Sequence, residues 1–131
     1  MRKVYLAGPI NGCTDGECSD WRGYAAERLN AETLDPMRRD FRGREEGQHY
    51  AIVTGDMKDI RECDVLLVNG WKPSWGTAME VFYAAHTLFK PVVMVVAPGA
   101  PVSPWQRFFS RAIVESLDEG IAAVNEILAK G

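Results

Sequence analysis

The chain has 131 residues, of which 47% are apolar and 25% charged, as in ordinary globular proteins. A chain of this length buries roughly two-thirds of its unfolded surface, which excludes intrinsic disorder, collagen-like repeats and a disulfide-stapled scaffold. Fifteen basic and eighteen acidic residues give a formal net charge of −3, which offers no general attraction to nucleic acids or anionic membranes. We therefore expect one domain over residues 1–131, without a nucleic-acid or membrane partner.

The chain lacks the signals of a membrane protein and of a metal protein. Its best apolar run, residues 92–97, has the length of a strand rather than the roughly 20 residues of a membrane span. The apolar stretch after the basic start of the chain is too short for a signal peptide. Cys13, Cys18 and Cys63 match no zinc spacing, and only two histidines are present. We expect free thiols, a cytoplasmic location and no metal or other cofactor.

Short apolar runs alternate with helical patterns along the chain. Strands are expected at 4–7, 33–34, 65–68, 92–96 and 112–114. Helices are expected at about 18–31, 49–63, 76–89 and 117–128. The arginine- and glycine-rich residues 36–48 predict a mobile loop, and 98–104 a rigid connection. This alternation predicts an α/β fold: a three-layer sandwich around a five-stranded parallel sheet of order 2-1-3-4-5, flavodoxin- or Rossmann-like.

Such a sheet places its ligand site beyond the carboxyl ends of strands 1 and 3, where the strand order reverses. The loops that leave these strands, 8–12 and 69–76, are both glycine-rich and could cradle a phosphate. Neither loop matches the P-loop or the dinucleotide fingerprint, so an ordinary ATP or NAD site is not expected. Trp71 and Trp75 could form an aromatic wall for a base or sugar, or equally belong to an interface or the core.

Two carboxylates are candidates for chemistry. Residues 77–80 spell a capping box, and on this pattern alone a capping role for Glu80 is favoured over catalysis. Asp56 borders an apolar stripe on its predicted helix, so it either faces a cleft or reaches solvent from the edge of the stripe. Asp59 is expected to point further towards solvent. The stripe consists of Val53, Met57 and Ile60.

Other polar side chains have equally plain explanations. Tyr5, near the end of the first strand, is by default a core tyrosine whose hydroxyl needs a partner. The loop arginines, Arg39 and Arg42 among them, could clamp a phosphate or belong to a solvated loop. His86 lies too far along its helix from Glu80 to reach the same site.

Three segments together resemble the nucleoside 2-deoxyribosyltransferase superfamily. They are Val4 to Ile10, Asp56 ahead of Cys63 to Val68, and Gly76-Thr77-Ala78-Met79-Glu80-Val81. Within the superfamily the chain is most similar to the 2′-deoxynucleoside 5′-phosphate N-hydrolases, and the resemblance extends to 116–120. It implies that Glu80 is the nucleophile that attacks C1′ of a nucleotide, that Tyr5 orients it, and that Asp56 exchanges a proton with the departing base. This division of roles agrees with retaining glycoside cleavage.

The resemblance also implies a phosphate site. Ser74 stands six residues before Glu80, where the transferases that act on free nucleosides carry an aspartate. A serine suits a phosphate that an aspartate would repel. Asn11 stands where the similar hydrolases place an arginine, a role that Arg39 or Arg42 could take from the loop. The full set of expected substrate-binding residues is Gly8, Ile10, Asn11, Gly12, Arg39, Trp71, Ser74, Gly76 and Ser103.

The resemblance further implies a homodimer or larger homo-oligomer, in which a second subunit completes the site; Ser103 is the nearest candidate for that contribution. The expected activity is hydrolysis of a nucleoside 5′-monophosphate to a free base and a (deoxy)ribose 5-phosphate. Base exchange by a deoxyribosyltransferase is one alternative. A non-catalytic nucleotide sensor is the other, and the intact set of Glu80, Asp56 and Tyr5 argues against it.

Overall fold

A computed structural model describes residues 1–131 and contains one five-stranded parallel sheet. The order β2-β1-β3-β4-β5 is the predicted one, so the α/β fold class and strand order are confirmed. β1 lies between β2 and β3, with Tyr5 opposite Leu34 and Leu66. The strands are β1 (Lys3–Ala7), β2 (Glu32–Leu34), β3 (Val65–Asn69), β4 (Val92–Val95) and β5 (Ala112–Val114).

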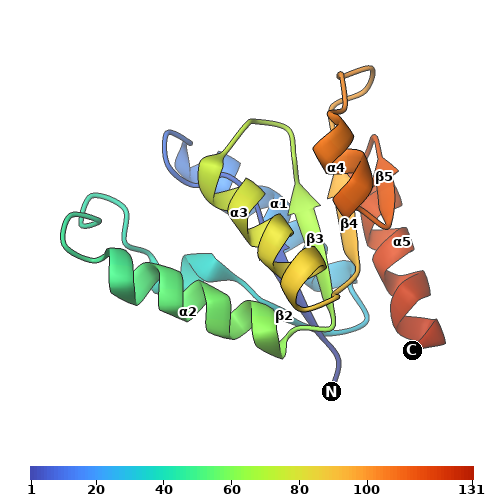
Figure 1. The fold of residues 1–131 in the computed structure, drawn as a ribbon, viewed down its shortest axis with the longest axis horizontal. Helices are drawn as coiled ribbons and strands as arrows, with labels where there is room; N and C mark the ends of the chain where they lie inside the picture. Colours follow the sequence, from blue (N-terminus) through green and yellow to red (C-terminus); the bar gives the residue numbers. More distant parts are fainter.

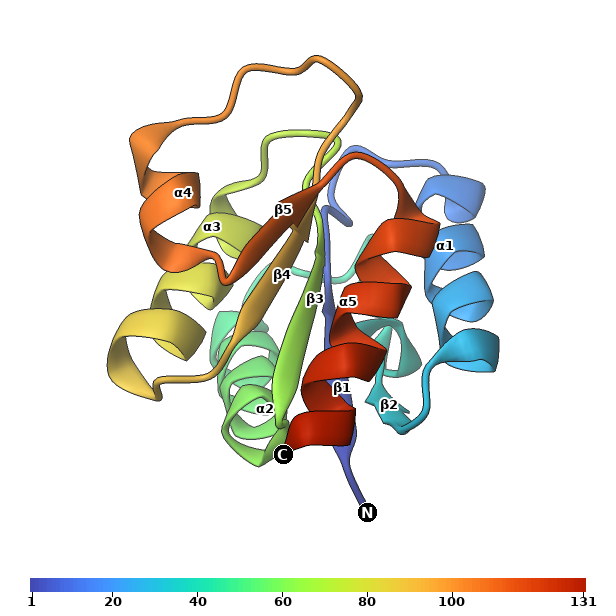
Figure 2. The same ribbon diagram turned by 90° about the vertical axis from the view of Figure 1, so that its right-hand side faces the viewer.

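Helices cover both faces of the sheet, which gives the three predicted layers (Figures 1 and 2). One face carries α1 (Asp15–Arg28) and α5 (Leu117–Lys130). The other carries α2 (His49–Glu62), α3 (Trp75–Phe82) and α4 (Pro104–Phe109). A 3-10 turn, η1 (Pro36–Arg39), follows β2, and a π-helical turn, η2 (Tyr83–Thr87), extends α3. No helix is both long and apolar enough to cross a membrane.

Alternation along β1 decides which side chains face the site. Successive side chains of a strand point to opposite faces, so Val4 and Leu6 pack with α1 and α5. Tyr5 and Ala7 pack on the opposite face, with residues of α2 and α3. The hydroxyl end of Tyr5 is thereby directed towards the layer that carries the two candidate carboxylates.

One prediction about the connections was wrong and one helix was not predicted, and both outcomes have a local cause. Residues 36–39 form η1 rather than the start of a mobile loop, because Asp35 accepts a hydrogen bond from the Met37 N–H at its start. The connection after β4 ends in a helix, α4. Ser103 and Gln106 form a capping box at its start, and Pro104 occupies its first turn.

Helix α1 begins at Asp15, earlier than predicted, because Thr14 and Glu17 form another capping box.

Candidate active site

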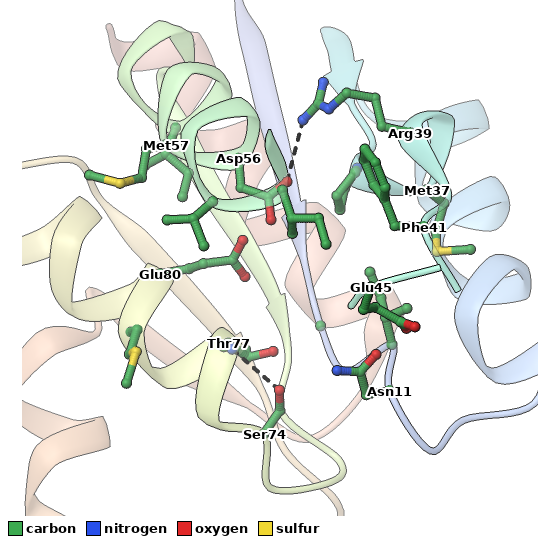
Figure 3. A pocket seen from close by; sticks show the side chains of 18 of the residues that line it. Asn11, Met37, Arg39, Phe41, Glu45, Asp56, Met57, Ser74, Thr77 and Glu80 are labelled. Atoms are coloured by element: carbon green, nitrogen blue, oxygen red, sulfur yellow. Dashed lines mark hydrogen bonds and ion pairs between the residues drawn. The ribbon is translucent and has the colours of Figure 1, made fainter. Parts of the chain in front are cut away.

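A pocket of about 470 Å³ lies on the α2–α3 side of the sheet (Figure 3). Its walls come from the loops after β1 and β3, from η1 and the loop that follows it, and from α2 and α3. The pocket therefore lies where the predicted topology places it, at the carboxyl ends of neighbouring strands. Of the substrate-binding residues expected from the sequence, six line it: Gly8, Ile10, Asn11, Arg39, Ser74 and Gly76.

Glu80 lines the pocket and is hydrogen-bonded to Tyr5. Tyr5 is fully buried in β1, and its hydroxyl donates a hydrogen bond to Glu80 Oε2. The predicted capping box is wrong, because Ser74 is the N-cap of α3 and its Oγ accepts the Thr77 N–H at 3.3 Å. Glu80 consequently lies in the second turn of α3, where its carboxylate faces Tyr5 and the pocket instead of the start of the helix.

The surroundings of Glu80 place its ionisation near neutral pH. Burial raises the pKa of Glu80 from 4.5 to about 7, and the charge of Asp56 adds to this. The hydrogen bond from Tyr5 and the charge of Arg22 oppose the rise. Burial and the neighbouring Glu80 raise the pKa of Tyr5 far above its usual range, so the phenol stays a neutral donor. A carboxylate poised in this way is available as a nucleophile at and above neutral pH.

Asp56 approaches the same space from α2. Its half-buried side chain lines the pocket and accepts a hydrogen bond from Arg39 Nη2 at 3.3 Å. Burial raises the pKa of Asp56, and the positive charge of Arg39 opposes this rise. Of the two alternatives left open by the sequence, the structure supports the side chain that faces a cleft. Such a carboxyl holds its proton to higher pH than an exposed aspartate.

Asp59 was expected to point towards solvent, and this expectation was wrong. Its side chain is only 5% exposed because η1 packs over this face of α2. Arg38 Nη2 lies 2.8 Å from Asp59 Oδ1, and Arg39 Nη2 lies 2.7 Å from Asp59 Oδ2. Burial alone would raise the pKa of Asp59, but these two hydrogen bonds outweigh it and lower the pKa.

The other end of the pocket is formed by Asn11 and Ser74 (Figure 3). Because the Ser74 oxygen accepts the Thr77 N–H, the hydroxyl proton of Ser74 remains available for a ligand. The first backbone N–H groups of an α-helix have no partner within the helix and attract anions. This end therefore offers hydrogen-bond donors to a ligand, beside the carboxylate of Glu45 (Figure 3).

Comparison with known proteins identifies the family of the chain. The family model described as nucleoside 2-deoxyribosyltransferase matches residues 4–123. The chain belongs to this family. Comparison with the curated proteins gives no match.

Solved structures of deoxyribosyltransferases share the fold. The 2-deoxyribosyltransferase of Bacillus psychrosaccharolyticus superimposes with a TM-score of 0.73 at 17% identity, covering 89% of this chain and 88% of that one. The Leishmania mexicana 2-deoxyribosyltransferase superimposes with a TM-score of 0.68 at 18% identity, covering 96% of this chain and 98% of that one. The Clostridium botulinum CMP N-glycosidase, BcmB, superimposes with a TM-score of 0.62 at 17% identity, covering 95% of this chain and 99% of that one. These likenesses establish the nucleoside 2-deoxyribosyltransferase fold.

Three residues expected in the substrate site of this deoxyribosyltransferase-family protein do not line its pocket. They are Gly12, Trp71 and Ser103. Trp71 is 58% exposed and Trp75 is 86% exposed, so neither forms the aromatic wall that their place in a loop after β3 suggested. Ser103, which was expected to contribute from a second subunit, is the N-cap of α4. Arg39 does line the pocket, but at the Asp56 end and not beside Ser74 (Figure 3).

Arg22 is a functional candidate that the sequence did not reveal. It is fully buried on α1 and donates to three carbonyl oxygens: those of Leu6 at 3.3 Å, Gly8 at 3.0 Å and Cys18 at 2.7 Å. These bonds fix the chain where it leaves β1, next to Tyr5. Burial lowers the pKa of Arg22, and the nearby Asp35 and Tyr5 counteract this. No pattern in α1 distinguishes Arg22 from the solvent-facing arginines of the chain.

The apolar wall of the pocket was also missed. It consists of Met37, Phe41, Ile52, Val53, Met57, Ile60, Met79 and Tyr83. These residues come from separate elements, and only the helical stripe of α2 indicated part of the wall in advance. An apolar wall beside a few convergent polar groups is the usual form of a small-molecule site. No three His, Cys, Asp or Glu side chains are grouped so that they could hold a metal ion.

Proposed function

We propose that this protein hydrolyses the bond between base and sugar in a (deoxy)nucleoside 5′-monophosphate. The observation that carries the proposal is the convergence of Asp56 and Glu80 from α2 and α3 in one pocket, with Ser74 at its opposite end. The buried Tyr5 of β1 supports this pair through its hydrogen bond to Glu80. Asp56, Glu80 and Tyr5 are suited to cleave a glycosidic bond, and the Ser74 end is suited to a phosphate.

Glu80 acts as the nucleophile in two steps. In the first step its carboxylate attacks C1′ and forms an ester with the sugar while the bond from C1′ to the base breaks. The proton of Asp56 passes to the leaving base, which would otherwise depart as a poor anionic leaving group. In the second step water attacks C1′, Asp56 accepts the proton from water, and Glu80 leaves as a carboxylate. The products are a free base and a (deoxy)ribose 5-phosphate.

Tyr5 keeps Glu80 in the orientation that the attack requires. Its hydroxyl bonds one carboxylate oxygen, Oε2, which leaves the other oxygen free to reach C1′. The same hydrogen bond favours the ionised carboxylate against the effect of burial. Tyr5 therefore increases the fraction of Glu80 that can act as a nucleophile at neutral pH.

The preference for a phosphorylated substrate rests on Ser74. Its free hydroxyl proton and the start of α3 supply donors, and no carboxylate lies at the position where the nucleoside transferases carry an aspartate. The apolar side chains of Phe41 and Met57 offer a surface for the planar face of the base. We infer that the nucleotide spans the pocket, with its phosphate at Ser74 and its base beside Asp56.

Transfer of the sugar to a second base is the alternative that the family membership favours, since the matching family model is that of deoxyribosyltransferases. Both reactions share the first step and the glycosyl-Glu80 intermediate. They differ in whether water or a base attacks that intermediate. A control variant at Glu80 alone does not separate them, whereas an added acceptor base does.

The test is a chromatographic screen of purified protein against ribo- and deoxyribonucleosides and their 5′-monophosphates, with and without an added base. We expect free base to appear from a monophosphate in water alone and to vanish in Glu80→Gln, which keeps the shape of the side chain. Product only from unphosphorylated nucleosides with an acceptor base would establish the transferase instead. A nucleotide that raises the melting temperature without turnover would establish a sensor.

A further inference from the structure

Four charged side chains form a network at the base end of the pocket. Arg38 and Arg39 belong to η1, while Asp56 and Asp59 lie one turn apart on α2. Asp59 accepts hydrogen bonds from both arginines, one to each of its oxygens. Arg39 uses the same nitrogen, Nη2, to contact Asp59 at 2.7 Å and Asp56 at 3.3 Å. Arg39 thus links the buried Asp59 to the carboxyl group that faces the pocket.

Gly55 leaves room for this link. A Cβ atom at Gly55 would lie 3.0 Å from Arg39 Nε and 3.3 Å from Arg39 Cζ. The guanidinium group therefore lies directly against the backbone of α2. Glycine is among the poorest residues for the interior of a helix, and Gly55 is in the middle of α2. The close approach of Arg39 gives a physical reason for a glycine at this position.

The link orients Asp56. One of its oxygens accepts the hydrogen bond from Arg39, and the other points into the pocket on the side of Glu80 (Figure 3). We propose that Arg39 is a positioning residue that holds the Asp56 carboxyl in this orientation, and that Asp59 and Gly55 keep Arg39 in place. The proposal rests on the function proposed above for Asp56 as the proton donor.

A role of Arg39 as a phosphate ligand fits the geometry less well. Both of its side-chain hydrogen bonds go to carboxylates of α2. Ser74 lies at the opposite end of the pocket (Figure 3). A guanidinium group that is already paired with two carboxylates also has little attraction left for a third anion.

The charges around Asp56 give the proposal a measurable consequence. The groups that face it are Arg39 from η1, Asp59 from its own helix, Tyr5 from β1 and Glu80 from α3, with Arg38 further away. Burial and the charge of Asp59 raise the pKa of Asp56, and Arg39 lowers it. Removing Arg39 must therefore raise the pKa of Asp56, so the limb of the pH profile that reports Asp56 moves to higher pH.

The first test compares wild type with Arg39→Gln and Arg39→Lys on the monophosphate that the wild type cleaves best. For Arg39→Gln we expect kcat at its own optimum pH to fall about tenfold, KM to stay within about threefold, and the limb of the pH profile that reports Asp56 to move to higher pH. Arg39→Lys restores the position of the limb but only part of kcat, because an ammonium group lacks the planar geometry of the guanidinium.

A matched pair of glycine variants separates positioning from stability. Gly55→Ala displaces Arg39 while it improves the intrinsic helix propensity of α2, so kcat falls without a loss of melting temperature. Gly23→Ala is the control, because a Cβ atom at this exposed position of α1 meets no atom within 4 Å. We expect kcat and KM of Gly23→Ala to equal those of the wild type.

Two results would overturn the proposal. If Arg39→Gln raised KM for the monophosphate alone and left the pH profile unchanged, Arg39 would be a phosphate ligand. If it lowered the melting temperature and left the Asp56 pKa unchanged, its role would be structural only. The Asp56 pKa can be measured by NMR on protein with 13C-labelled aspartate carboxyls, with Asp56→Asn to assign the signal. This measurement decides the proposal even if the wild type cleaves no nucleotide, in which case only the proposed function fails.

Discussion

Tyr5, Asp56 and Glu80 form a coupled set in which each side chain changes the proton affinity of the others. Glu80 sits between a donor that stabilises its ionised form and a carboxyl whose charge destabilises that form. The two neighbours therefore act on Glu80 in opposite directions. This opposition distinguishes a coupled set of titratable groups from residues that are merely close to one another.

Conservative substitutions at the two neighbours should shift the Glu80 pKa to opposite sides of about 7. Tyr5→Phe removes a hydrogen bond that opposes the effect of burial, so the pKa rises. Asp56→Asn removes a negative charge, so the pKa falls. NMR titration of 13C-labelled glutamate carboxyls measures both shifts, and Glu80→Gln assigns the signal. Shifts in the same direction would contradict the coupling described here.

The raised pKa of the half-buried Glu80 also predicts that this residue lowers the stability of the protein at alkaline pH. Its folded-state pKa of about 7 lies above the ordinary 4.5, so its stabilising contribution is complete below pH 4.5 and is lost as the pH rises through 7. A difference of this size corresponds to about 3 kcal/mol. Glu80→Gln should therefore unfold at higher urea concentration than wild type at pH 8, although it is inactive. Equal midpoints at pH 8, or a lower midpoint for the variant, would show that ionised Glu80 is not destabilising.

At the scale of elements, the packing of α5 against the sheet depends on a single small residue. A Cβ atom at Gly120 would lie 2.6 Å from Val95 Cγ2 and 3.2 Å from Leu67 Cδ1. Because α5 contacts β3 and β4, an added methyl group must push the helix away from two central strands.

Gly120→Ala should lower the free energy of unfolding by about 1–3 kcal/mol, because overpacking outweighs the better helix propensity of alanine. Urea denaturation measures the change. Gly23→Ala is the control, since no atom lies within 4 Å of its Cβ position, and it should be neutral or stabilising by at most about 1 kcal/mol. A stabilised Gly120→Ala variant would mean that α5 moves aside without strain.

Elements with a strong local pattern were predictable from the sequence, and elements fixed by tertiary contacts were not. The apolar run at 65–68 was correctly predicted to be a strand, since it could be buried only inside a sheet. The burial of Asp59 was not predictable, because a helical wheel of α2 contains no information about η1 lying over it. The capping box of Ser103 and Gln106 was present in the sequence and would have revealed α4.

At the scale of the whole molecule, the strand order explains how distant residues meet. Tyr5 and Glu80 are 75 positions apart, yet β1 and β3 are neighbours and the loop after β3 leads directly into α3. The sequence therefore predicted the location of the site and the polar residues that carry the family pattern. It did not predict the apolar wall or the burial of Arg22, since both depend on how separate elements pack in three dimensions.

An exposed aromatic surface extends from the rim of the pocket. Phe82 on α3 stacks on His86 and contacts Phe109 on α4, which in turn contacts Trp105 and Phe108. Trp105 is 71% exposed and Phe108 is 82% exposed. Contiguous apolar patches of this kind are rare on monomers and mark interaction surfaces. Met79, one turn before Phe82, lines the pocket and is itself exposed, so this surface adjoins the site.

The family resemblance implies a homo-oligomer, and we expect a second copy of the chain to cover this surface. Sedimentation equilibrium should give a dimer or larger oligomer for wild type, and Phe108→Glu should give a monomer, because a charge buried in an apolar interface is strongly unfavourable. Tyr50→Glu is the control, since Tyr50 is an exposed aromatic residue of α2 outside this cluster of rings. If the partner completes the pocket, Phe108→Glu also loses turnover in proportion to its dissociation. A wild type that remains monomeric at micromolar concentration would contradict this expectation and would leave the pocket as a site within one chain.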